Sequence, residues 1–149
     1  MRAYAIGESE VKGFMNRLLR EALFDGYEVR GVEISAMTRV DISGETEADE
    51  TRRFCLWSEL RPLVRLIIQQ GEKPRAVKIV FSCGAEVCAA VHENASALFL
   101  NLLYENGGVT FTAATAQKQF ALDKSLDAAW DDYVSRFFKD HGVNAAVLT

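Results

Sequence analysis

The sequence predicts an α+β fold made of duplicated β-α-β-β(-β) units, with two helices on one side of curved antiparallel sheets and a C-terminal helix. Three observations support this prediction. Helical spacing and two-residue alternation both occur in the chain. The order strand, helix, strands occurs twice, and 149 residues are typical of one domain. We therefore expect a single domain, 1–149, with halves of about 1–50 and 51–116 and a C-terminal helix over about 123–141.

The first half is predicted to begin with a short strand and a helix. Residues 2–6 alternate as in a strand, and the hydroxyl of Ser9 can cap the helix that follows. Apolar residues then recur at spacings of three and four, which places them on one helical face: Val11, Phe14, Met15, Leu18, Ala22 and Leu23. Asp25 and Gly26 are expected to end this helix.

An alternating stretch runs from Tyr27 to Ile42. Because it is longer than an average strand, it predicts either one bent strand or two strands joined by a tight turn. Gly31 is a candidate for a bulge within it. The acidic segment 43–53 lacks apolar anchors and is predicted to be a loop.

The second half follows the same order. Residues 53–57 predict a short strand, and Ser58 can cap a second helix that Gly71 is expected to end. The apolar face of this helix comprises Leu60, Leu63, Val64, Ile67 and Ile68. A strand over 77–83 follows. Residues 85–94 fit either two turns of helix or a strand, and we favour the strand.

The C-terminal part predicts a hairpin and a third helix. Asn106-Gly107-Gly108 lies between two β-rich runs and is a strong hairpin signal. Asp123 or Ser125 can cap the third helix, whose apolar residues are Leu126, Ala129, Trp130, Tyr133, Val134, Phe137 and Phe138. Residues 143–149 predict either a tail or a short edge strand.

The two first helices resemble one another. "SEVKGFMNRLL" from Ser9 and "SELRPLVRLII" from Ser58 align without a gap, and each follows a predicted strand and precedes others. Any two amphipathic helices can be aligned in this way, so the match alone does not establish a duplication. Together with the strands around both helices, it indicates a domain of two related halves.

This element order resembles the domain of the DNA sliding clamps. The resemblance implies helices that line a channel around DNA and present cations to phosphates. The corresponding basic side chains here are Lys12, Arg17, Arg20, Arg61 and Arg65. A charged row on an amphipathic helix is also what a simple solvated face looks like, and that interpretation stays open. A ring around DNA needs several such domains, and this chain has one.

The chain also resembles a family of small bacterial proteins known only as a domain of unknown function. The resemblance runs nearly end to end and rests on "FMNRLL", "SELRP", "GEKP", "NLLYENG" and "FALDKSLDAAWD". It implies no reaction, cofactor or catalytic residue.

Cys83, Cys88 and His92 form the pattern Cys-x4-Cys-x3-His. Structural zinc sites favour two to four residues between paired cysteines and need a fourth ligand, for which only Glu86 or the distant His141 is available. Small apolar cysteines in or near a strand explain the pattern better. We therefore predict no metal site, cofactor or catalytic residue.

The function expected from these observations is a non-enzymatic, clamp-like binding module for nucleic acid or a protein partner. The alternative is a small metal-dependent or acid-base enzyme centred on Cys83, Cys88 and His92. The net charge of −4 argues against a uniformly basic nucleic-acid binder. No leader and no apolar run of about 18 residues is seen, so we expect a cytoplasmic protein that does not enter a membrane. Its oligomeric state stays open.

Overall fold

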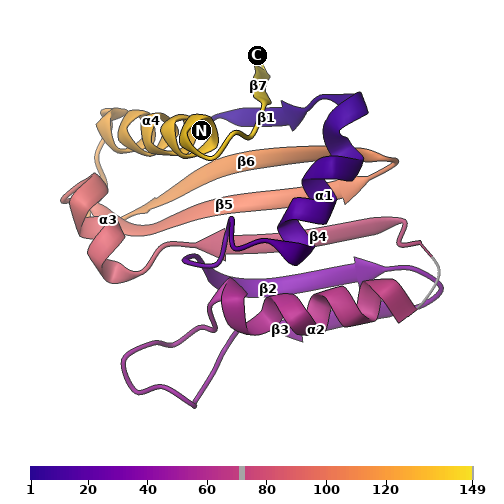
Figure 1. The fold of residues 1–149 in the computed structure, drawn as a ribbon. Helices are drawn as coiled ribbons and strands as arrows, with labels where there is room; N and C mark the ends of the chain where they lie inside the picture. Colours follow the sequence, from indigo (N-terminus) through magenta and orange to yellow (C-terminus); the bar gives the residue numbers. More distant parts are fainter. Residues whose placement is uncertain (71–72, 149) are drawn as a thin grey trace.

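A computed structural model describes residues 1–70 and 73–148 and contains one seven-stranded antiparallel sheet (Figure 1). The strands are β1 (Ala3–Ile6), β2 (Glu28–Ser35), β3 (Arg39–Ser43), β4 (Ala76–Ser82), β5 (Ala95–Glu105), β6 (Gly108–Gln117) and β7 (Ala145–Leu148). The helices are α1 (Val11–Arg20), α2 (Trp57–Gln70), α3 (Ala85–Val91) and α4 (Ser125–Asp140), with a 3-10 turn, η1 (Glu8–Glu10), before α1. The strand order is β3-β2-β4-β5-β6-β1-β7.

The helices α1, α2 and α4 all lie over one face of the sheet (Figure 1). The strands explain why, because their apolar residues alternate. On β4, Val77, Ile79 and Phe81 are fully buried on the helix side, whereas Lys78 between them is exposed. The predicted α+β class, with its main helices on one side, is therefore confirmed, and the strands form a single open sheet.

The alternating stretch after Tyr27 consists of two strands. β2 and β3 form an antiparallel hairpin, and the register of β2 shifts between Val29 and Gly31, where a bulge was expected. Residues 53–57 do not form a strand of the main sheet. They contribute isolated bridges, in which Phe54 pairs with Glu45 and Leu56 with Glu28.

The hairpin at Asn106 is confirmed. Asn106 and Gly107 have φ values of 52° and 73°, the positive values that a two-residue turn between twisted strands requires. The third helix is α4, close to its predicted limits. The C-terminal residues form β7, a short edge strand that pairs with β1.

Further sequence predictions were wrong. The first helix ends at Arg20, before the predicted Asp25 and Gly26. Residues 85–91 form the helix α3 rather than a strand; Val87, Cys88 and Val91 have helical as well as alternating spacing, and Cys88 N–H bonds to the carbonyl of Gly84. Neither serine caps its helix. η1 precedes α1 and no side chain caps it, while Ser58 lies inside α2, where the Glu59 carboxylate accepts the N–H of Leu56 instead. The predicted end at Gly71 lies outside the described residues.

The strand pairing differs between the two halves. β1 pairs with β6 and β7 and is separated from β2 by β4, β5 and β6. In the second half, β4 and β5 are neighbours, with α3 inserted between them in the chain. The resemblance of α1 to α2 therefore does not extend to their strands, and the duplication stays a prediction.

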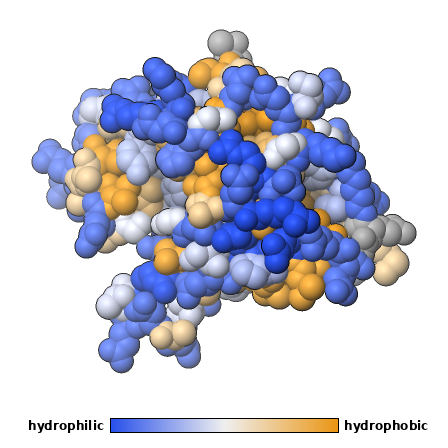
Figure 2. All heavy atoms as spheres, viewed as in Figure 1, coloured by the Kyte–Doolittle hydropathy of each residue, from blue (hydrophilic) through white to orange (hydrophobic). Residues whose placement is uncertain are grey.

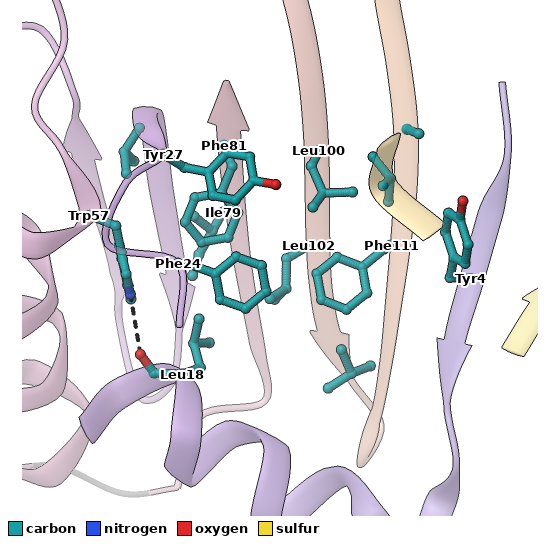
Figure 3. Close-up of a cluster of buried hydrophobic side chains, with 14 of the residues drawn as sticks. Tyr4, Leu18, Phe24, Tyr27, Trp57, Ile79, Phe81, Leu100, Leu102 and Phe111 are labelled. Carbon is teal, nitrogen blue, oxygen red and sulfur yellow. Dashed lines mark hydrogen bonds between the residues drawn. The ribbon is translucent and has the colours of Figure 1, made fainter. Parts of the chain in front are cut away.

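An aromatic cluster joins the helices to the sheet (Figure 3). Phe24, on the segment after α1, stacks on Phe81 of β4 with ring centroids 4.9 Å apart. Trp57 begins α2 and donates its indole N–H to the carbonyl of Leu18, 3.2 Å away (Figure 3). This bond between the C-terminal part of α1 and the first turn of α2 fixes how the two helices lie relative to each other.

Candidate functional site

A hollow of about 510 Å³ lies between α1 and α2, and we call it the α1–α2 groove. Its lining is mainly apolar and comes from both helices, from β5 and from the segments beside them: Val11, Met15, Leu19, Ile68, Pro74, Tyr104 and Gly107. Three charged residues complete it: Glu8, Lys12 and Lys73. The size is within the range of ligand and peptide pockets.

The groove follows from the helical spacing. Met15 and Leu19 are one turn apart on the side of α1 that faces α2, next to the buried stripe of Val11, Phe14 and Leu18. These side chains are only partly buried, because α1 and α2 meet closely near Trp57 and leave a gap elsewhere. Amphipathic faces of both helices therefore meet around an open apolar space.

The exposed side of α2 is also apolar. Leu63 and Leu66 are 46% and 52% exposed, and Met37 on the β2–β3 turn is 83% exposed. A second hollow, of about 490 Å³, lies between α2 and the β2–β3 hairpin and contains Ile67. Figure 2 shows hydrophobic surface at the position of α2 among hydrophilic side chains. The groove is thus part of a larger apolar region along α2.

Two of the five predicted basic residues bind within the chain. Arg17 donates to the backbone carbonyls of His141 and Gly142, at 2.7 and 3.2 Å, and so ties α1 to the end of α4. Arg61 makes two bonds of 2.9 Å to the Asp25 carboxylate, which raise the pKa of its guanidinium further above the ordinary value. Both guanidinium groups have structural partners.

The other three, Lys12, Arg20 and Arg65, make no ion pair within the described ranges 1–70 and 73–148. Lys12 lines the groove. Arg65 is one turn from both Arg61 and Ile68, which places it on the side of α2 toward α1. Lys12 and Lys73 in the lining, with Arg65 on the side of α2 toward α1, give the groove a mainly basic rim, although the chain as a whole is acidic.

Cys83, Cys88 and His92 do not converge on a common point. Cys88 Sγ donates to the carbonyl of Cys83 at 3.7 Å, whereas His92 Nε2 lies 3.0 Å from Ser125 Oγ at the start of α4. In the described part of the chain, no three His, Cys, Asp or Glu side chains gather as metal ligands would. Burial raises the pKa of Cys83 to about 12 and also raises that of Cys88.

Cys83 is expected to resist modification in the native protein. At pH 8, a thiol with this pKa is about one ten-thousandth thiolate, and the thiolate is the reactive form. In the variant Cys55→Ser/Cys88→Ser, the remaining thiol should not react with Ellman's reagent within an hour, but should react at once in 6 M guanidinium. Rapid native labelling would instead favour the enzyme alternative.

Sequence reasoning assigned Met15 and Ile68 to apolar helix faces, did not include Leu19 in the face of the first helix, and did not recognise the groove. Their spacing is that of core residues, and nothing in it distinguishes a fully packed face from one that borders a gap. Tyr104 lies on β5 with the alternation of an ordinary strand. No signal in the sequence marked these residues as a site.

Comparison with known proteins identifies one family. A family model with the description "Family of unknown function (DUF5721)" matches residues 17–145. No curated protein and no solved structure matches the chain. Across residues 1–70 and 73–148, no helix has the length and apolar character needed to cross a bilayer.

Proposed function

The chain belongs to the DUF5721 family of unknown function, and we propose that it is a protein-binding module whose α1–α2 groove takes an acidic amphipathic segment of a partner. The observation that carries the proposal is the combination of an apolar groove with a basic rim on an acidic protein. Apolar contacts supply most of the affinity in such grooves, and the charges around them select the partner.

The apolar lining defines the shape of the partner segment. The groove has Met15 and Leu19 on its α1 wall and Ile68 on its α2 wall. The space between these walls can take apolar side chains of a segment that lies along the groove. An amphipathic helix presents such side chains at positions i, i+3, i+4 and i+7. The exposed Leu63 and Leu66 lie on the opposite side of α2 from Ile68 and are not part of the groove.

The rim defines the charge of the partner. Lys12 and Lys73 lie at the groove and Arg65 beside it, against the single carboxylate of Glu8. Glutamate or aspartate on the flanks of the bound segment would pair with these cations. A basic segment would be repelled by the same residues.

The same features favour a protein partner over nucleic acid. Binding to duplex DNA depends on cations that are available to phosphates. Arg17 and Arg61 bond within the chain, and the outer side of α2 carries Leu63 and Leu66 where phosphates would need cations.

Selection from a random 16-residue peptide library on the immobilised full chain tests the proposal. We expect the selected peptides to be acidic and to carry apolar residues at helical spacing. The triple variant Lys12→Glu/Arg65→Glu/Lys73→Glu should weaken peptide binding by at least about 10-fold in fluorescence anisotropy. Each ion pair at the rim contributes only modestly to affinity, but the variant replaces all three with repulsion. Higher salt should weaken binding to the unaltered protein.

The matched control is Arg136→Glu, which reverses an exposed charge on α4 away from the groove. It should leave peptide binding within about 2-fold, and melting curves should show that both variants fold. Failure to select any peptide, or peptides that bind the triple variant equally well, would contradict the proposal. Salt-sensitive binding to duplex DNA that the triple variant loses would establish the nucleic-acid alternative instead.

A further inference from the structure

A separate cavity of about 430 Å³ lies between the segment after α1, the start of α3 and the C-terminal half of α4. We call it the Tyr27 cavity. Its lining combines aromatic side chains with small residues and polar groups: Ala22, Leu23, Gly26, Tyr27, Cys83, Gly84, Val87, Tyr133, Phe137 and His141. None of these residues lines the α1–α2 groove.

The hydroxyl of Tyr27 has no hydrogen-bond partner among the residues that the structure describes. The residue is 7% exposed, and its Oη is buried without a hydrogen bond to any group in the described part of the chain. Buried hydroxyls nearly always have a partner, because leaving one unpaired costs free energy. The ring is held in place by Phe81 and Phe137, with centroids 5.8 and 5.3 Å away. Packing thus fixes an unpaired, water-inaccessible hydroxyl on a residue that lines the cavity.

The hydroxyl and thiol groups of the cavity lining are neutral. Burial raises the pKa of Tyr27 well above its ordinary value and that of Cys83 to about 12, so both keep their protons at neutral pH. Burial also raises the pKa of Tyr133. No lysine or arginine lines the cavity, and His141 is exposed, with Nδ1 2.9 Å from the carbonyl of Phe137. The buried part of the lining therefore offers uncharged hydroxyl and thiol donors.

The walls favour a flat molecule. The Phe137 ring meets Tyr27 edge to face, and it lies 4.4 Å from the His141 ring. Aromatic walls of this kind hold planar ligands by stacking and edge contacts. The volume is sufficient for a small ring compound.

We propose that the Tyr27 cavity binds a small, neutral, planar aromatic or heterocyclic molecule whose carbonyl oxygen accepts a hydrogen bond from the Tyr27 hydroxyl. The hydroxyl is sealed from water, so binding includes a shift of Tyr133 or Phe137, both half-buried on α4. The bound carbonyl supplies the acceptor that this hydroxyl lacks within residues 1–70 and 73–148.

Three probes of similar size test this proposal on the full chain: benzamide, benzoate and toluene. Titrations followed by amide NMR should show benzamide shifting the signals of Gly26 and Gly84, which line the cavity. Benzoate should bind at least about 5-fold more weakly, because its charge has no partner among the buried hydroxyl and thiol groups. Toluene should bind more weakly than benzamide, because it has no acceptor.

The variant Tyr27→Phe removes only the hydroxyl. It should weaken benzamide binding about 3- to 10-fold and leave toluene binding unchanged, as expected for one hydrogen bond. The matched control is Tyr104→Phe, since Tyr104 is also 7% exposed but lies in the α1–α2 groove. It should not alter benzamide binding.

Several results would overturn the proposal. They are the absence of benzamide shifts at Gly26 and Gly84, benzoate binding as strong as benzamide, and equal benzamide affinity in Tyr27→Phe and the unaltered protein. None of them bears on the groove, whose residues the probes do not address.

Discussion

Replacing Phe24 by alanine is expected to lower the free energy of unfolding by about 3–5 kcal/mol, the usual cost of deleting a buried phenyl ring. Phe24 is fully buried and meets rings from α1, β4, β6 and α4: Phe14, Phe81, Phe111 and Phe137, as well as the neighbouring Tyr27. The surrounding elements cannot all move inward to fill the space left by the deleted phenyl ring. Much of that space should therefore remain empty. Urea denaturation followed by circular dichroism measures the change.

The control for this variant is Phe120→Ala. Phe120 is 85% exposed, so the same substitution should change the free energy of unfolding by less than about 0.5 kcal/mol. A loss below about 1 kcal/mol for Phe24→Ala would show that the aromatic cluster is not the centre of the core.

Replacing Gly44 by alanine is expected to cost about 3 kcal/mol or more, at the upper end of overpacking effects. A Cβ at this position would lie 1.6 Å from the backbone oxygen of Val29. That oxygen belongs to β2 and cannot move aside as a side chain can. Gly44 also donates its N–H to Arg30 and accepts a bond from Cys55, at 3.0 and 2.7 Å, so its own backbone is held as well.

Gly7→Ala is the matched control, because a Cβ at Gly7 meets nothing within 4 Å. In thermal melts the Gly44 variant should lose about 10 °C, given the usual relation between stability and melting temperature for a chain of this size. The Gly7 variant should stay within about 2 °C. Equal melting temperatures for the Gly44→Ala and Gly7→Ala variants would contradict the close approach of the Gly44 backbone to the backbone of β2.

Much of the fold could be predicted from local patterns. The alternation of Val77, Ile79 and Phe81, the spacing of Val11, Phe14 and Leu18, and the turn residues Asn106 and Gly107 each determine an element through nearby residues. Element identity is encoded within a few residues. The strand order is not, because β1 pairs with β6 and β7 from more than 100 residues away.

Short and capped segments were harder to predict. In α3, Val87 and Val91 fit both a strand and a helix over only seven residues. The bonds from Cys88 to the carbonyls of Cys83 and Gly84 are local and form only once the helix is present, so no side-chain pattern predicts them. Ser58 has the expected chemistry of a cap, yet α2 begins at Trp57 because burial of that indole sets the start of the helix.

The candidate site could be predicted only in part. The basic positions Lys12 and Arg65 follow from helical spacing, but the sequence could not show that Arg17 would bind the end of α4 or that Arg61 would bind Asp25. Those partners lie 124 and 36 positions away along the chain. The groove and the Tyr27 cavity are gaps between packed elements, and no local pattern encodes a gap.

Methyl NMR of the full chain with a selected acidic peptide tests the central claim most directly. We predict that the methyl signals of Met15, Leu19 and Ile68 shift on titration and show intermolecular NOEs to the apolar side chains of the peptide. Signals of Ala128 and Ala129 on α4, a helix that contributes no residue to the groove lining, should not change. Peptide contacts confined to the sheet, with Met15, Leu19 and Ile68 unaffected, would contradict the account.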